Sequence, residues 1–385
     1  MYRAITLTKH VCLLVLAVVL AACGGGGGGG GAAPPPPTGT PPPPADPLGA
    51  VGTLAQEQER LFESLGTGVI APRYENFALA ATALETDMAA YCADPASGMI
   101  STLQSAWQDT MLAWQGVTIV RIGPVEEQNR RFRIQFFPDP NNAVFNNVSS
   151  LLNDVQPIDE ARVSNSPVGA QGLPALEYLL FELGGLDDAT DGQRRCGLAV
   201  AITENLDTMA QELSAAWALN GQLQSDFATG SGTFMDRTEV LTGILESLAQ
   251  ETEFVADEKV TRPQQTGPLT TESFRSEFSR ENLEVNVAAI RAFLDRGPAD
   301  TDYGFRDYLR RAHDSESIAD QLDAQLAQAE TGIDALNSSL ESILMGTSTG
   351  DIDTIRTSLQ DLADLFIDAA VAADVNLGFN NQDGD

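Results

Sequence analysis

The sequence predicts an all-α protein, because hydrophobic residues recur at intervals of three and four along most of the chain. The stretch 101–117 places on one helical face the residues Leu103, Trp107, Met111, Trp114 and Val117. Residues 318–343 and 352–366 continue this spacing over many turns. Strand-like alternation is confined to the short segment RFRIQFF at 131–137. We therefore expect helices that pack as bundles.

The N-terminus predicts a lipoprotein signal peptide at residues 1–22. Arg3 and Lys9 precede an apolar run that ends in Leu-Ala-Ala-Cys at Cys23, followed by eight glycines. A transmembrane helix needs about 20 apolar residues, and this run is shorter. We expect cleavage before Cys23, with lipid, including palmitate, on its thiol and amine. Gly24, where an aspartate would signal retention, favours a periplasm-facing outer-membrane lipoprotein in a Gram-negative host.

Residues 23–47 predict a tether, because glycine runs are flexible and proline runs are extended. Folded structure is expected from residue 48. Breaks rich in glycine, proline, asparagine and aspartate leave nine or ten helices, too many for one four-helix bundle and suited to two. We therefore expect one helical bundle at 48–188, a second at 189–385, and a shared cleft.

Charge and histidine content exclude several functions. The formal net charge is −32, from 54 acidic and 22 basic residues, so no nucleic-acid partner is expected. A cation or a basic protein surface is the more natural counterpart. The histidines are His10 and His313, and His10 falls in the signal peptide. A histidine-rich zinc site and a Ser-His-Asp triad are therefore disfavoured, and no catalytic residue is assigned.

Two cysteines remain besides Cys12 of the signal peptide and the lipidation site Cys23, namely Cys92 and Cys196. In an oxidising compartment such a pair often forms a disulfide, which would close a loop of about 100 residues. In the chain-entropy model that closure contributes about 4–5 kcal/mol. Two buried thiols are the alternative. Neither cysteine has a histidine nearby in sequence, which disfavours nucleophilic chemistry.

One acid lies in an otherwise apolar helical stretch, GLPALEYLLFEL at 172–183. On a helical wheel Glu177 falls between the leucine stripe and Phe181, whereas Glu182 points to the opposite side. Pro174 fits the first turn, and the helix N-terminus favours the charge on Glu177. Burial of this acid requires a cation, a metal or several hydrogen bonds. A purely structural ion pair, with Arg121 or Arg133, is the alternative.

Several segments, in this order and spacing, resemble the imelysin family over roughly residues 55–385. They are VIAPRYENFALAATALETDMAAYC, LQSAWQDTMLAWQGVTIVRIGPV, FFPDPNN, GLPALEYLLF, EKVTRPQ, SEFSRENLEVNVAAI and the closing LGFNNQDGD. The family is named after an insulin-cleaving membrane protease. The resemblance implies two facing helical bundles, with the family's G-x-H-x-x-E segment at their cleft. It also implies a periplasmic or outer-membrane protein linked to iron uptake, with a peptidase assignment attached.

The sequence departs from that motif at one position. Gly172 and Glu177 match its glycine and glutamate, but Pro174 occupies the histidine position. A His-Glu metal centre and peptidase activity are therefore disfavoured. Oxygen ligands from Glu177, Asp139 and Gln115 would suit iron(III), Ca²⁺ or Mg²⁺ better than zinc.

Alternatively the cleft binds a small ligand or peptide, with Glu177 paired to Arg133 or Lys259. Lys259 falls on the family's lysine position, as a cleft residue or as an exposed lysine at a helix end. The candidate ligand-binding residues are Glu177, Gly172, Pro174, Trp114, Gln115, Arg133, Asp139, Lys259 and Ser279, with Glu177 as the candidate metal ligand.

The sequence thus predicts a lipid-anchored binding protein linked to iron uptake, with the bilayer and an iron-uptake receptor or other envelope protein as partners. Its cofactor, if it has one, is iron or another oxygen-ligated cation. A peptidase and an adaptor lipoprotein that binds a protein partner are the alternatives.

Overall fold

The computed structural model describes residues 46–95, 98–182, 185–186, 191–295 and 302–377, and these contain helices and no strand. The all-α prediction is therefore confirmed. The segment 131–137 is not a strand, because Arg130–Ile134 forms the helix α4. The predicted signal peptide, the lipidation site Cys23, the tether up to residue 45 and the end of LGFNNQDGD lie outside the described residues.

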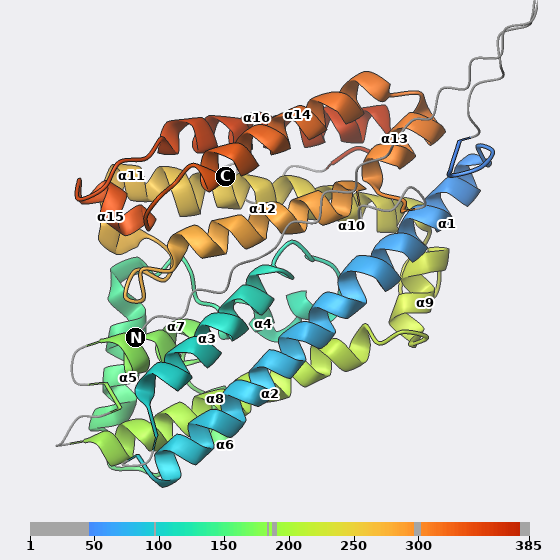
Figure 1. Cartoon of the computed structure of the whole chain (residues 1–385). Helices are drawn as coiled ribbons and strands as arrows, with labels where there is room; N and C mark the ends of the chain where they lie inside the picture. Colours follow the sequence, from blue (N-terminus) through green and yellow to red (C-terminus); the bar gives the residue numbers. More distant parts are fainter. Residues whose placement is uncertain (1–45, 96–97, 183–184, 187–190, 296–301, 378–385) are drawn as a thin grey trace, which may run out of the picture. The chain divides into compact units, whose positions relative to one another are not determined.

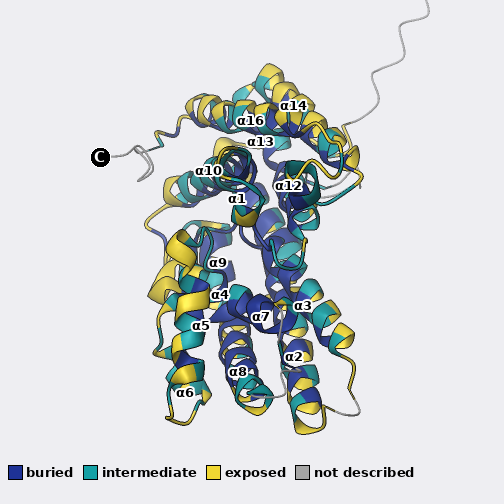
Figure 2. Cartoon of the chain, turned by 90° about the vertical axis from the view of Figure 1, so that its left-hand side faces the viewer, coloured by how far each residue is buried: buried dark blue, intermediate teal, exposed yellow. Residues whose placement is uncertain are grey.

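The first group of helices contains α7, which lies beside α3 and α5 (Figure 1). It comprises α1 (Leu54–Leu65), α2 (Ala71–Ala93), α3 (Ile100–Gln115), α4 (Arg130–Ile134), α5 (Ala143–Asn153), α6 (Glu160–Ser164), α7 (Gly172–Phe181) and α8 (Gly192–Ala216). Helix α2 packs along α3 and α8, and α7 contacts α3, α5 and α8. Figure 2 shows α7 as a buried helix, with the exposed surfaces of α5 and α6 farther out.

The second group comprises α9 (Gln222–Thr229), α10 (Arg237–Phe254), α11 (Arg262–Thr266), α12 (Ser279–Asp295), α13 (Phe305–His313), α14 (Glu316–Asp334), α15 (Leu340–Leu344) and α16 (Ile352–Ala372). Helices α14 and α16 pack side by side and cover α12 and α10 (Figure 1). The described chain has more helices than the nine or ten predicted. Four of these helices, α4, α6, α11 and α15, have five residues each, too few to show a hydrophobic period.

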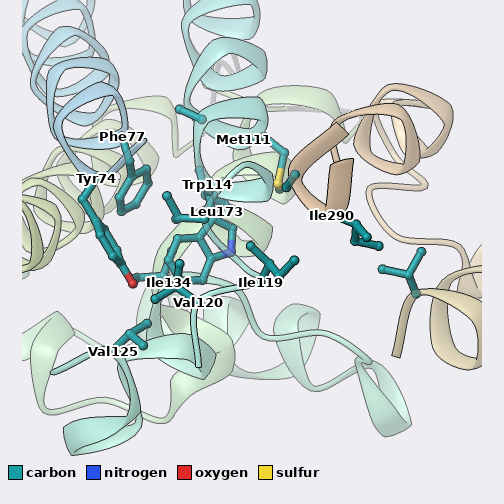
Figure 3. Close-up of a cluster of buried hydrophobic side chains, with 14 of the residues drawn as sticks. Tyr74, Phe77, Met111, Trp114, Ile119, Val120, Val125, Ile134, Leu173 and Ile290 are labelled. Carbon is teal, nitrogen blue, oxygen red and sulfur yellow. The ribbon is translucent and has the colours of Figure 1, made fainter. Parts of the chain in front are cut away.

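The expected division between residues 188 and 189 stays a prediction. Helix α8, which follows that point in the sequence, packs along α2. The chain from Asp46 onward forms one compact unit by its internal contacts. Buried side chains of both groups also belong to one continuous core. Figure 3 shows part of it, with Tyr74 and Phe77 of α2, Met111 and Trp114 of α3, and Ile290 of α12.

Two helices continue through a π-helical turn instead of ending. Helix α1 runs into α2 through Gly66–Ile70, and α10 runs into α11 through Val255–Thr261. A π turn inserts an extra residue and thereby rotates the side chains that follow, and such turns are frequent at functional sites. Lys259 lies in the second of these turns.

The predicted disulfide is present. Cys92 at the end of α2 and Cys196 in the second turn of α8 are joined, 104 positions apart in sequence. The bridge therefore fixes two neighbouring helices to each other at one end.

Among the described residues, none of the helices combines the length and the apolar character that spanning a bilayer requires.

Candidate functional site

A cavity of about 580 Å³ lies beside α7. Its walls are α7 itself, the loop 135–142 that follows α4, and the segment 269–275 that precedes α12. Three of the sequence candidates line it, namely Asp139, Pro174 and Glu177. Five aromatic rings line it as well: Phe136, Phe137, Phe145, Tyr178 and Phe274. We call this cavity the Glu177 pocket.

Gly172 sets the position of α7. Its φ of +67° lies in the left-handed region, and a Cβ at this residue would come within 2.1 Å of the Ile134 carbonyl oxygen. Only glycine permits this close approach of α4 to the first residue of α7. The indole Nε1 of Trp107 donates to the Leu173 carbonyl at 2.9 Å, which holds the same end of the helix. Pro174 lies in the first turn, where its missing N–H leaves no bond unmade.

Glu177 is 3% exposed and lines the pocket. Its Oε1 accepts from the Ser276 amide at 2.9 Å, the Ser276 hydroxyl at 2.8 Å and the Arg275 amide at 3.1 Å. Oε2 of Glu177 accepts no hydrogen bond from the described residues. Burial raises the pKa of Glu177 from 4.5 to about 7, although the bonds from Ser276 and the charge of Arg275 act in the opposite direction.

Arg275 is a pocket residue that the sequence did not single out. Its Nε pairs with Glu182 at 3.1 Å, and its guanidinium lies 4.2 Å from the Phe274 ring centroid and 5.4 Å from that of Tyr178. The expectation that Glu182 points away from Glu177 was wrong. Helix α7 ends at Phe181, and the extended backbone of Glu182 brings its side chain to the pocket. The one available signal was that Arg275 precedes Ser276 in the S-x-x-S pattern.

Lys259 lies in a buried polar network behind the pocket wall. Its ammonium is within 2.7 Å of Gln115 Oε1, 2.8 Å of Asn286 Oδ1 and 2.9 Å of Glu272 Oε1. Gln135 also donates to Glu272 Oε1, at 2.7 Å. Lys259 is 2% exposed, so it is not an exposed lysine at a helix end. Its acidic partner is Glu272, which lines the pocket, and not Glu177.

The remaining candidates lie away from Glu177 and have other partners. Trp114 donates to Gln135 at 2.8 Å. Arg133 donates to Gln171 and Asn205, each at 3.0 Å. Ser279 donates to Glu341 at 2.7 Å. Arg121, the other expected partner of Glu177, pairs with Glu251 at 2.9 Å. The pairing of Glu177 with Arg121, Arg133 or Lys259 was therefore wrong.

The residues do not fit the oxygen-ligated metal site that Glu177, Asp139 and Gln115 were expected to form. Asp139 accepts from the amides of Ala143 and Val144 and thereby caps α5, and burial raises its pKa. The Gln115 oxygen is taken by Lys259 and Asn286. The described ranges contain no group of three or more histidine, cysteine, aspartate or glutamate side chains placed to hold a metal ion.

The family is decided by a match of the imelysin model to residues 70–367. The chain belongs to the imelysin family. An imelysin-like protein from Psychrobacter arcticum 273-4 has 18% identity and a TM-score of 0.68, over 86% of this chain and 99% of its own. A Parabacteroides distasonis ATCC 8503 protein described as an iron-regulated protein A precursor has 15% identity and a TM-score of 0.70, over 86% and 98%. None of the curated proteins matches. Pro174 occupies the position at which the resemblance to the family implied a histidine.

Proposed function

We propose that this imelysin is an exported, lipid-anchored protein that captures a ligand in the Glu177 pocket, in a role connected with iron uptake. The observation that supports capture is the pocket itself. It is lined by Glu177, which is 3% exposed and whose Oε2 accepts no hydrogen bond from the described residues, so that oxygen can accept one from a ligand. The description of the Parabacteroides distasonis protein as iron-regulated supports the connection with iron.

Binding accounts for the site better than peptide hydrolysis does. A metallopeptidase needs a metal-bound water and a base to activate it. The motif position that would supply a histidine is Pro174, and Gln115 is held by Lys259. His313 lies at the end of α13 and contacts Tyr308, so it belongs to another part of the fold. The side chains at the pocket therefore suit recognition of a ligand.

The proposed location rests on the N-terminal pattern. A lipid on Cys23 would hold the protein at the outer membrane, facing the periplasm, with the segment up to residue 47 as the spacer. The bilayer is then one partner, and an iron-uptake receptor or another envelope protein is the second. Radiolabelled palmitate should enter the wild-type chain and not Cys23→Ala. Equal labelling of both would contradict lipidation at this residue.

The function is tested by growth on limiting iron in a strain that lacks the gene. The wild-type chain should restore growth, and Glu177→Gln, which keeps the shape of the side chain, should not. Normal growth of the deletion strain would refute the connection with iron. In parallel, isothermal titration of the full chain in detergent with ferric citrate, Fe²⁺ and Ca²⁺ establishes whether the pocket takes a metal. A heat that Glu177→Gln abolishes would mark Glu177 as part of that site.

A further inference from the structure

Two carboxylates of the Glu177 pocket have one oxygen that accepts no hydrogen bond from the described residues. Glu272 lines the pocket and is 3% exposed. The Lys259 network contacts its Oε1, and its buried Oε2 has no hydrogen-bond partner among the described residues. At Glu177, likewise, three donors contact Oε1 and none of the described residues donates to Oε2. An ionised carboxylate only accepts hydrogen bonds, so a ligand that donates one suits the Oε2 of Glu177, whereas the Oε2 of Glu272 is itself buried.

The basic side chains of the pocket are already paired. Arg262 contacts Glu258 at 2.8 Å, one turn away on its own helix. Arg275 pairs with Glu182 and lies against two aromatic rings. The pocket lining carries the four acids Asp139, Glu177, Glu182 and Glu272 against these two arginines, so an anionic ligand would enter a pocket with an excess of acidic side chains. A cationic ligand meets Glu177, which has no ion pair among the described residues and whose Oε1 is bonded to neutral donors.

The pocket also offers apolar surface. Phe145 is 40% exposed and packs edge-on against Tyr178, with ring centroids 5.7 Å apart. Phe137 packs edge-on against Phe254 at 6.2 Å, and Phe136 lies beside it in the same wall. Aromatic faces attract organic cations and bury their hydrocarbon parts. They supply no oxygen ligand to a metal ion.

We propose that the Glu177 pocket binds organic ammonium compounds, with the protonated amine at Glu177 and the hydrocarbon body against the aromatic wall. A primary ammonium carries three N–H donors, which matches acceptors that lack a partner. This inference rests on the proposed function, because it assumes that the pocket is the ligand site. Two sources share the chemistry, namely aromatic monoamines and polyamines.

Binding should release protons near neutral pH. Glu177 has a raised pKa and is partly protonated at pH 7. An ammonium beside it favours the ionised form and lowers its pKa. The charged groups that share the pocket with Glu177 are Arg275 and Arg262, both paired, and the acids Asp139, Glu182 and Glu272. None of these brings an unpaired positive charge to Glu177, so the ligand's charge decides the titration.

The test is isothermal titration of the full chain in detergent at pH 7, in two buffers with different ionisation enthalpies. The probes are 2-phenylethylamine, spermidine and 2-phenylethanol, which carries a hydroxyl in place of the ammonium. We expect at least one amine to bind about tenfold or more tighter than 2-phenylethanol, because charge-assisted hydrogen bonds are lost in the alcohol. Glu177→Gln should lower the affinity for that amine by a similar factor and should remove the proton release on binding. Asp109→Asn, an exposed acid on α3 outside this pocket, is the charge-matched control.

The outcomes separate this inference from the proposed function. Tighter binding of 2-phenylethylamine than of spermidine assigns the aromatic monoamines, and the reverse order assigns the polyamines. The inference is overturned if 2-phenylethanol binds as tightly as the amines, or if Glu177→Gln binds the amine as tightly as the wild-type chain. If no amine binds but ferric citrate binds in a Glu177-dependent way, the inference fails and ligand capture stands. If no probe binds, both fail. Should Glu177→Gln melt earlier than wild type, proton release by the wild-type chain decides the question.

Discussion

Two glutamates, Glu177 and Glu251, are equally inaccessible to solvent but differ in ionisation. Glu251 is 1% exposed, and its Oε2 contacts Arg121 at 2.9 Å and Arg131 at 3.1 Å. Burial alone would raise the pKa of Glu251, but these arginines lower it to about 2. Glu177 is 3% exposed and accepts from amides and a hydroxyl, and its pKa is raised to about 7.

The difference shows that partners, and not burial, decide the charge of a glutamate in this fold. Paired guanidinium groups offset the loss of hydration at Glu251, as an ion pair does when both charges are buried together. Neutral donors at Glu177 offset only part of that loss. Glu251 is therefore a structural acid. Glu177, with its pKa raised to about 7, is partly protonated near neutral pH, and a ligand can displace that proton.

The largest expected effect is at the paired acid. Glu251→Gln removes the charge that Arg121 and Arg131 share, and leaving buried charges unpaired costs about 3–5 kcal/mol. Urea unfolding at pH 7 should show this loss in the free energy of unfolding. Glu177→Gln at the same pH is the matched control, because removal of the Glu177 carboxylate breaks no arginine–carboxylate pair. If Glu251→Gln lowers the free energy of unfolding by less than about 1 kcal/mol, Glu251 is not a structural acid and the difference from Glu177 is not supported.

The second expected effect is a pH dependence at Glu177. Because its folded-state pKa is raised from 4.5 to about 7, its contribution to stability is fully present below pH 4.5 and is lost as the pH rises through 7. Glutamine does not titrate. The stability of Glu177→Gln relative to wild type should therefore grow by about 3 kcal/mol between pH 4.5 and 7.5. Urea unfolding of both chains at four pH values measures this, and parallel curves would contradict it.

The smallest expected effect is at the pocket rim. The Glu182 side chain is 42% exposed, so its pair with Arg275 is well solvated. Such pairs contribute about 0.2–1 kcal/mol, and Glu182→Gln should lower the free energy of unfolding by no more than that. Thermal unfolding checks the change, with Asp109→Asn as a control for lost surface charge. A loss above about 2 kcal/mol would place this pair with Glu251 among the structural acids.

Local patterns in the sequence were sufficient for several features. The three- and four-residue spacing of apolar side chains predicted helices, because a helix repeats its faces at that interval. Gly172, Pro174 and Glu177 marked the pocket helix, since a lone acid in an apolar stretch must find compensation. The two cysteines indicated their own pairing, which the structure contains. Glu182 was misplaced because the helical wheel was continued through it, whereas α7 ends at Phe181.

The sequence by itself determined the helical class, the family resemblance and the burial of Glu177, because each depends on residue types at short, fixed spacings. Only the tertiary structure decided which charges meet. Glu177 lies 98 positions from Arg275, Lys259 lies 13 from Glu272 across a π turn, and Arg121 lies 130 from Glu251. Pairings at such separations depend on how helices dock and on where a π turn rotates a side chain. The short-range spacing of residues predicts neither the docking of helices nor the position of a π turn. The pairings that result determine the ionisation of the acids in the core.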